Sequence, residues 1–240
     1  MSAWLAVHWA EVLGFGTGAL CVFLAARRNI WTFPVGIANN LVFLVLFSGA
    51  ALYADAGLQL VYLALGVQGW VLWARGRRSQ GASAGAGRAD AGDAGAGAGG
   101  ADARGGDARG ADARGAGFVR RTPVRAVLPL AIGFVALTAL LVWVLASFTD
   151  STTELPDAAT TAGSLVAQLM LNRRWLGTWF VWIAVDVAYV GLYAAKGLWI
   201  TAVLYALFIG LCVDGYRSWR RRGLADAVAA QPGGVVARAG

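Results

Sequence analysis

The sequence has few charged residues, one histidine and one lysine, and each shortage removes a class of protein. Only 14% of the residues are Asp, Glu, Lys or Arg, whereas soluble domains average about 25%. A chain whose only histidine is His8 cannot form a histidine-based metal cluster or a Ser-His-Asp triad. The lone lysine, Lys196, is not part of a Gly-x4-Gly-Lys motif, so an ATP-binding P-loop is excluded. The sequence therefore predicts no enzyme, no metal site and no cofactor.

Apolar residues are in excess. Hydrophobic residues make up 58% of the 240 positions, the mean hydropathy is +0.61, and eleven residues are Trp, which gathers at membrane interfaces. No soluble domain of this size needs so much apolar surface. Cys21 and Cys212, the only two cysteines, lie in apolar stretches, where a free cysteine behaves as a small hydrophobic side chain. The composition predicts a polytopic, all-α membrane protein.

Seven apolar segments are candidates for membrane helices, since a bilayer core takes roughly 20 helical residues. They are 11–26, 30–51, 54–74, 125–148, 156–171, 175–194 and 197–216. Arg-rich connections alternate with connections that are acidic or carry only Lys196, and the positive-inside rule places Arg-rich connections in the cytoplasm. This predicts seven crossings of the plasma membrane, with the N-terminus outside and the C-terminus inside. The net charge of +7 lies in these connections and not in a basic groove, which argues against a nucleic-acid partner.

Residues 79–117 consist only of Ala, Gly, Asp, Arg, Ser and Gln, with a short tandem repeat, ADARGGDARGADARG, at 101–115. Such a stretch cannot bury enough apolar surface to offset its ordering entropy, so we expect a disordered cytoplasmic linker. The linker divides the chain. We expect a first three-helix bundle (1–78), the linker (79–122), an inverting helix (123–150), a second three-helix bundle (151–222) and a cytoplasmic tail (223–240).

The two bundles carry a faint internal repeat. The third segment ends in Gly69-Trp70-x-x-Trp73, and the seventh ends in Gly215-Tyr216-x-x-Trp219. Both bundles are predicted to cross the membrane in the same sequence of directions, with the inverting helix between them. That arrangement is a 3+1+3 parallel repeat, as in transporters of the SWEET type.

Polar side chains inside apolar segments are costly, so each is a candidate functional residue. Trp179, Trp182 and Asp186 recur at i, i+3 and i+7 and share one stripe of a helix. Aromatic rings stack on flat ligands and attract cations, while amides bind sugar hydroxyls, so the candidates suit a flat, polar, uncharged or cationic ligand. The residues leave an alternative open, which is that they only join helices or anchor them at the interface.

Several motifs resemble the PnuC family of bacterial nicotinamide riboside transporters. They are WTFPVGIANN at 31–40, LYADAGLQ at 52–59 with Tyr62, the Gly-Trp-x-x-Trp of 69–73, Trp-x-x-Trp-x-x-x-Asp at 179–186, and Leu-Tyr-x-x-Lys-Gly-Leu at 192–198 with Tyr205. The sequence departs from the family at Thr178, where members often have Asn.

This resemblance implies uniport of nicotinamide riboside by facilitated diffusion and alternating access, in a homotrimer. The substrate-binding candidates on the matching motifs are Trp31, Asn40, Gln59, Tyr62, Trp70, Trp179, Trp182, Asp186 and Tyr205. Relatives that carry riboflavin or thiamine share the fold, so these vitamins are alternative substrates. A membrane receptor that binds without transport is the alternative from another class.

Overall fold

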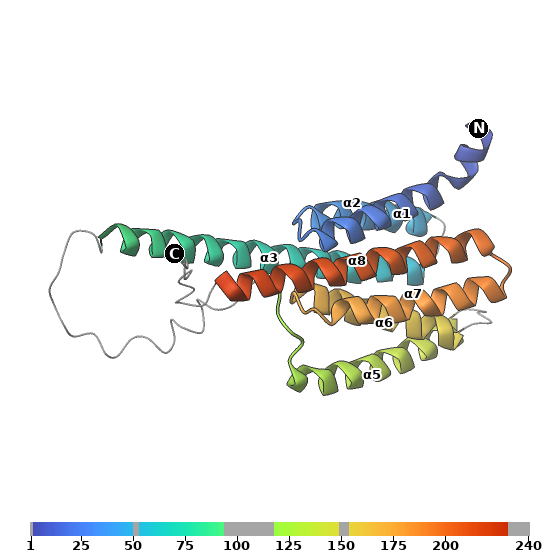
Figure 1. The fold of residues 1–240 in the computed structure, drawn as a ribbon. Coiled ribbons are helices and arrows are strands. Elements are labelled where there is room, and N and C mark those ends of the chain that lie inside the picture. Colours follow the sequence, from blue (N-terminus) through green and yellow to red (C-terminus); the bar gives the residue numbers. More distant parts are fainter. Residues whose placement is uncertain (1, 50–52, 94–117, 149–153, 230–240) are drawn as a thin grey trace.

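The computed structural model describes residues 2–49, 53–93, 118–148 and 154–229, which form seven helices (Figure 1). Their bounds are α1 Ser2–Ala26, α2 Thr32–Gly49, α3 Tyr53–Asp93, α5 Val124–Phe148, α6 Glu154–Asn172, α7 Thr178–Ala195 and α8 Trp199–Ala229. Each of the seven apolar segments coincides with one helix, so the predicted all-helical fold class is confirmed.

Five helices, α2, α3, α5, α7 and α8, contain a stretch long and apolar enough to cross a membrane, and α1 contributes the shorter apolar stretch Leu13–Ala26. Helix α6 is not among them, because it carries polar residues along its length. Three of these, Thr160, Ser164 and Asn172, are buried, since α3, α5 and α7 all pack against α6. Helix α6 therefore belongs to the interior of the bundle, where its polar groups meet protein and not lipid.

The helices form two three-helix units, α1–α3 and α6–α8, that meet where α1 packs against α8 and α3 against α6. Helix α5 lies at the edge and packs against α6 (Figure 1). No part of its apolar span is buried. In chain order the described helices are thus three packed helices, the separate helix α5 and three further packed helices.

The turns that leave α1 and α6 have the same geometry 146 residues apart. Arg28 and Arg174 both adopt a left-handed backbone, with φ of 58° and 60°. The amide of Arg28 donates to the carbonyl of Ala25, and the amide of Arg174 donates to that of Leu171, each at 2.9 Å. A left-handed residue after a helix directs its amide back to the last turn. The two turns are thus built from equivalent residues.

The two units also exchange equivalent hydrogen bonds. The indole of Trp73 in α3 donates to the carbonyl of Leu171 in α6 at 3.2 Å. The indole of Trp219 in α8 donates to the carbonyl of Ala25 in α1 at 2.9 Å. Both indoles are fully buried, and donors and acceptors are again 146 residues apart. These reciprocal contacts support the internal repeat expected from the Gly-x-x-x-Trp motifs.

The start of the second helix in each unit repeats the pattern. The hydroxyl of Thr32 in α2 donates to the carbonyl of Cys21 at 2.9 Å, and the hydroxyl of Thr178 in α7 donates to that of Ala167 at 2.8 Å. An aromatic residue, Phe33 or Trp179, follows each threonine.

Phe118 lies within the expected linker, but it packs between the two three-helix units. Only 5% of its surface is exposed. Its ring forms T-shaped pairs with Trp73 and Trp219, at centroid distances of 4.9 and 6.5 Å. The guanidinium groups of Arg28 and Arg174 lie over the ring at 5.4 and 5.1 Å, and such contacts are attractive. Phe118 therefore contacts the same two residue types, one tryptophan and one arginine, in each unit.

The boundaries of the expected linker differ from the structure at both ends. Helix α3 continues to Asp93, and the backbone of Arg120 pairs with that of Arg174 and Leu176, both at 2.9 Å. Residues 94–117 lie outside the described part of the chain. The composition of residues 79–117 predicts a linker, but it does not predict that Phe118 and Arg120 contact the helical units.

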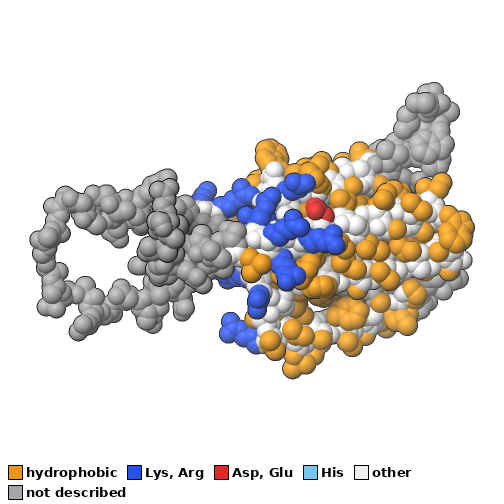
Figure 2. Space-filling view, in the orientation of Figure 1, with side chains coloured by type: hydrophobic (Ala, Val, Ile, Leu, Met, Phe, Trp, Pro, Cys, Tyr) orange, Lys and Arg blue, Asp and Glu red, His pale blue; other side chains and the backbone are white. Residues whose placement is uncertain are grey.

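Arginine side chains gather in a band at one end of the bundle, where α1 leads into α2 and α6 leads into α7 (Figure 2). Burial and the nearby Arg120 lower the pKa of Arg174 in this band. Lys196 caps α7 at the turn into α8, which lies at the opposite end in Figure 1. The uneven distribution of positive charge along the sequence is therefore also an uneven distribution between the two ends of the folded bundle.

Candidate functional site

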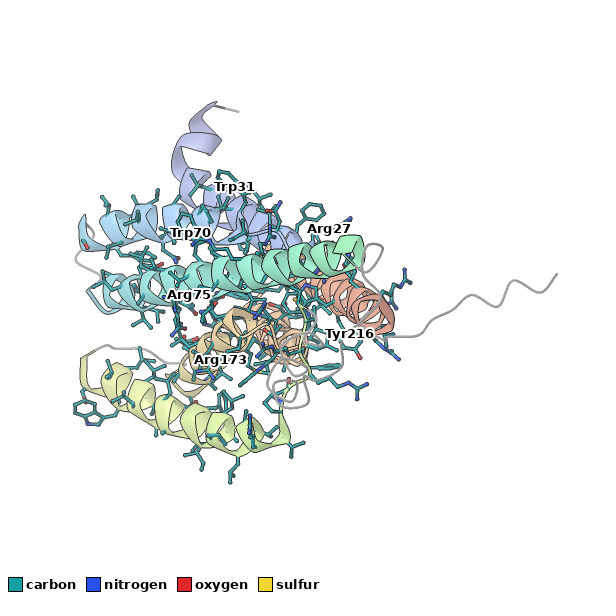
Figure 3. All side chains as sticks on the ribbon, turned by 90° about the vertical axis from the view of Figure 1, so that its left-hand side faces the viewer. Arg27, Trp31, Trp70, Arg75, Arg173 and Tyr216 are labelled. Carbon is teal, nitrogen blue, oxygen red and sulfur yellow. The ribbon has the colours of Figure 1, made fainter. Side chains whose placement is uncertain are left out.

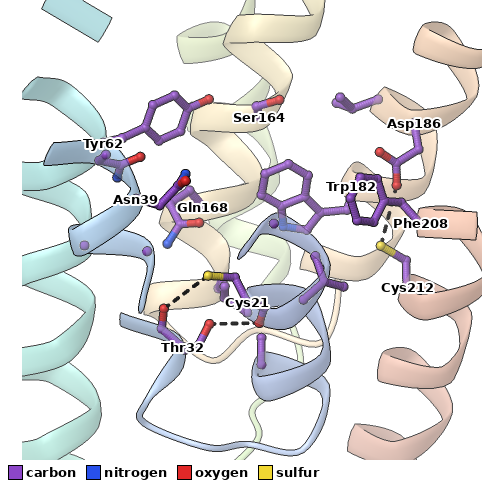
Figure 4. A pocket seen from close by; sticks show the side chains of 18 of the residues that line it. Cys21, Thr32, Asn39, Tyr62, Ser164, Gln168, Trp182, Asp186, Phe208 and Cys212 are labelled. Carbon is purple, nitrogen blue, oxygen red and sulfur yellow. Dashed lines mark hydrogen bonds between the residues drawn. The ribbon is translucent and has the colours of Figure 1, made fainter. Parts of the chain in front are cut away.

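A cavity of about 350 Å³ lies between the two three-helix units (Figure 4). All six helices of the two units contribute to its wall, and α5 does not. The volume is in the range that proteins use for small molecules, about 300–1,000 Å³. The cavity is therefore a candidate binding site at the junction of the repeated units.

The structure brings six of the nine candidate residues to this cavity. They are Asn40, Tyr62, Trp179, Trp182, Asp186 and Tyr205. Their helices are α2, α3, α7 and α8, so residues far apart in the sequence converge on one space.

Trp31, Gln59 and Trp70 do not line the cavity. Trp31 lies in the turn before α2 and is 63% exposed, and Trp70 is 43% exposed. Figure 3 shows both beside α2 and α3. Trp70 follows Gly69, which is buried against the neighbouring helix α2 at Phe33. Successive helical residues are about 100° apart, so Trp70 faces away from the interior.

Amide groups are concentrated on one side of the cavity, on α2 and α6. Asn39 accepts a hydrogen bond from the hydroxyl of Thr17 at 2.8 Å, and Gln168 donates to Asn172 at 3.1 Å. Asn39 and Gln168 both line the cavity with Asn40, although neither is among the nine candidates. Their unused donors and acceptors are suited to hydroxyl groups of a ligand.

One carboxylate faces the cavity. Asp186 is 5% exposed, and the thiol of Cys212 donates to its Oδ2 at 3.7 Å. Among the described residues, no group of three His, Cys, Asp or Glu side chains could hold a metal ion. Asp186 is thus the acidic side chain of the cavity wall, and it does not belong to such a group.

Tyrosine rings form a third part of the wall. Tyr189 and Tyr205 stack at a centroid distance of 4.6 Å, and Tyr193 stacks on Tyr205 at 5.4 Å. Tyr189, like Phe208, lines the cavity and is not among the candidates. Phe43 lies 146 residues before Tyr189, so the two units have an aromatic residue at equivalent positions. This match is the feature of the sequence that could have identified Tyr189 as a candidate.

Trp179 has a buried donor without a partner. Its side chain is 1% exposed, and its ring packs edge-on against Trp219 at 5.4 Å. Within the described part of the chain, its Nε1 is the one buried side-chain nitrogen or oxygen that makes no hydrogen bond. Leaving such a donor unpaired costs about 1–3 kcal/mol. Trp179 is also one of the residues that line the cavity.

These features define a class: a polytopic membrane protein whose two helical units enclose a cavity of small-molecule size. The chain belongs to the family described as nicotinamide mononucleotide transporter, which matches residues 8–221. It is therefore a membrane transporter. This membership confirms the resemblance and the transporter class predicted from the sequence, and it implies a protein that is not an enzyme.

Individual relatives carry different vitamins. The nicotinamide riboside transporter PnuC of Escherichia coli is 24% identical over 213 residues, which cover 89% of this chain and 85% of that protein. The riboflavin/roseoflavin transporter RibM of Streptomyces davaonensis is 28% identical over 221 residues, which cover 92% of this chain and 89% of that protein. A crystal structure of the vitamin B3 transporter PnuC matches with a TM-score of 0.59 at 20% identity, over 91% of this chain and 83% of that one. This last likeness shows the shared fold.

Proposed function

We propose that the chain transports nicotinamide riboside across the plasma membrane by facilitated diffusion. The observation that carries this proposal is the cavity between the units, in which Trp182 offers a ring face, Asn40 an amide and Asp186 a negative charge. Nicotinamide riboside has a flat cationic pyridinium and a ribose, and each of these features meets a matching group. The name of the Escherichia coli relative supports the same substrate.

Riboflavin is the second candidate, because the Streptomyces relative is a riboflavin/roseoflavin transporter. Its flat, uncharged ring system can stack on the same aromatic side chains. The carboxylate of Asp186 favours the first candidate, since a neutral ring gains nothing from an opposite charge.

The proposal includes an orientation and an assembly. From the positive-inside rule we infer that the end of the bundle with the arginine band (Figure 2) faces the cytoplasm, with the N-terminus outside and the C-terminus inside. Transport proceeds by alternating exposure of the cavity between the two units, and the chain assembles as the homotrimer that the resemblance implies. Labelling of single cysteines introduced at each end tests the orientation, and native mass spectrometry tests the trimer.

Uptake into proteoliposomes tests the function. Labelled nicotinamide riboside is added to vesicles without ATP or an ion gradient, with unlabelled nicotinamide riboside, riboflavin and thiamine as competitors. We expect equilibration that only unlabelled nicotinamide riboside inhibits. Flux of riboflavin or thiamine would replace the substrate and keep the mechanism, whereas binding without flux of any of the three would establish a receptor.

A further inference from the structure

The cavity wall is unequal in its two halves. At three positions in the first unit, Gly18, Gly36 and Gly66 line the cavity. At the matching positions 146 residues later, the second unit contributes Ser164, Trp182 and Cys212. Glycine leaves the space that a side chain fills in the other unit. Of these three pairs, the largest difference in side-chain size is between Gly36 and Trp182.

Position 36 has room for a side chain. A Cβ atom added to Gly36 would have its nearest neighbour, the Sγ of Cys21, at 3.7 Å, which is an ordinary contact. By contrast, a Cβ at Gly66 would lie 3.1 Å from the side chain of Ile37, which would have to shift by a few tenths of an ångström. Gly36 is not required by the contacts around it or by an unusual backbone angle. Another reason must account for the missing side chain.

Trp182 supplies the complementary surface. Its indole is only partly buried, packs against the aromatic core of the bundle on one side and lines the cavity (Figure 4). A flat ligand ring gains most when it covers such a face completely. A bulky residue at position 36, which borders the same cavity from the opposite unit, would take up the space that the ring needs.

We propose that Gly36 sets the size of the ring system that the cavity accepts, because it leaves the space in which that ring stacks on Trp182. The inference rests on the proposed function and assigns the selection by size to one position. Side chains of increasing volume at position 36 exclude ligands progressively, and a fused, multi-ring ligand is excluded before a single-ring ligand.

Binding measurements on purified protein test the inference. Nicotinamide riboside and riboflavin are titrated first against the wild type, and each ligand that binds then serves as a probe for Gly36→Ala, Gly36→Val and Gly36→Leu. The matched control is Gly210→Leu in α8, because a Cβ at Gly210 has nothing within 4 Å and that position does not line the cavity. Melting temperatures establish that all variants are folded, and Gly36→Ala keeps the test valid if the larger variants do not fold.

We expect about a tenfold loss of affinity for Gly36→Ala and about 100-fold or more for Gly36→Leu, since a single methylene in a binding pocket changes recognition by about 10- to 200-fold. The control variant keeps wild-type affinity. If both ligands bind, riboflavin loses more than nicotinamide riboside at each step. Wild-type affinity in a folded Gly36→Leu variant would overturn this inference alone. Failure of the wild type to bind either ligand would overturn it together with the proposed function.

Discussion

Replacing Trp179 by Phe separates its ring from its hydrogen-bond donor. Phe33 occupies the equivalent position in the first unit, so the helix start accepts either residue. The substitution removes Nε1, which has no partner within the described residues, and keeps an aromatic ring beside Trp219. If the substrate accepts a hydrogen bond from Nε1, affinity must fall although no contact between protein side chains is lost.

The size of this loss follows from the burial of Trp179. A net hydrogen bond contributes about 0.5–1.5 kcal/mol, which corresponds to roughly a two- to twelvefold weaker affinity at 25 °C. The outer atoms of the indole ring lie close to Gly215, so the smaller Phe also leaves a small cavity. We therefore expect a lower melting temperature together with the loss of affinity.

A matched variant distinguishes the two effects. Trp219→Phe also shortens a buried ring, but its Nε1 donates to the carbonyl of Ala25, and Trp219 does not line the cavity. This variant is expected to lose stability and to keep wild-type affinity. Both variants are measured by isothermal titration with nicotinamide riboside and by thermal unfolding in detergent. An affinity of Trp179→Phe equal to that of the wild type would refute the assigned contact.

Further variants test the charge, the helix contacts and the packing of Phe118. Asp186→Asn should weaken nicotinamide riboside by roughly tenfold, the loss of one charge contact, and leave riboflavin unchanged; equal effects on both would contradict the electrostatic role. Gly69→Ala and Gly215→Ala each place a Cβ in steric conflict with the side chain of a neighbouring helix, and overpacking should cost about 1–3 kcal/mol, seen as a lower melting temperature; unchanged melting would show that the helices shift freely. Phe118→Ala should cost about 3–5 kcal/mol, whereas Phe180→Ala, whose ring is 58% exposed, should have little effect on the same measurement.

Five of the helices follow from the sequence because their apolar runs are about as long as a bilayer is thick. Even α6, which is too polar to qualify by hydropathy, is predictable from its place between charged connections. The continuation of α3 to Asp93 is not predictable in this way, because Ala favours a helix while Gly opposes it, and composition alone does not decide between them.

Phe118 shows what a linear pattern does not contain. Its environment is made by Arg28, Trp73, Arg174 and Trp219, four residues that are distant in sequence. No local periodicity connects them. Only the tertiary packing of both units reveals that Phe118, which lies within the expected linker 79–122, is buried.

The candidate site is predictable where helical phase and motif agree. Trp179, Trp182 and Asp186 share a stripe, and all three line the cavity. Trp31 and Trp70 are candidates by resemblance alone, and their positions in a turn and on the outer side of α3 separate them from the cavity.

The equivalent positions of the two units include residues of the cavity wall, but the sequence alone does not identify these positions. An offset of 146 matches Asn40 with Asp186 and Gly36 with Trp182, all of which line the cavity. The Leu-Tyr-Ala motifs at 52–54 and 192–194, however, are 140 residues apart. Because the sequence offers both offsets, the equivalent positions become clear only from the matching turns and indole hydrogen bonds of the folded units.

The polar character of α6 has a consequence for how the protein is made. A helix with so many hydroxyl and amide groups gains too little from lipid to partition into a bilayer by itself. The helix synthesised just before it, α5, has the most apolar of the membrane-spanning stretches and packs directly against it. Helix α5 thus provides the neighbour against which α6 can insert as a pair during synthesis. We therefore expect α6 to enter the membrane only after α5 has done so, so that the chain order of these two helices is also their order of insertion.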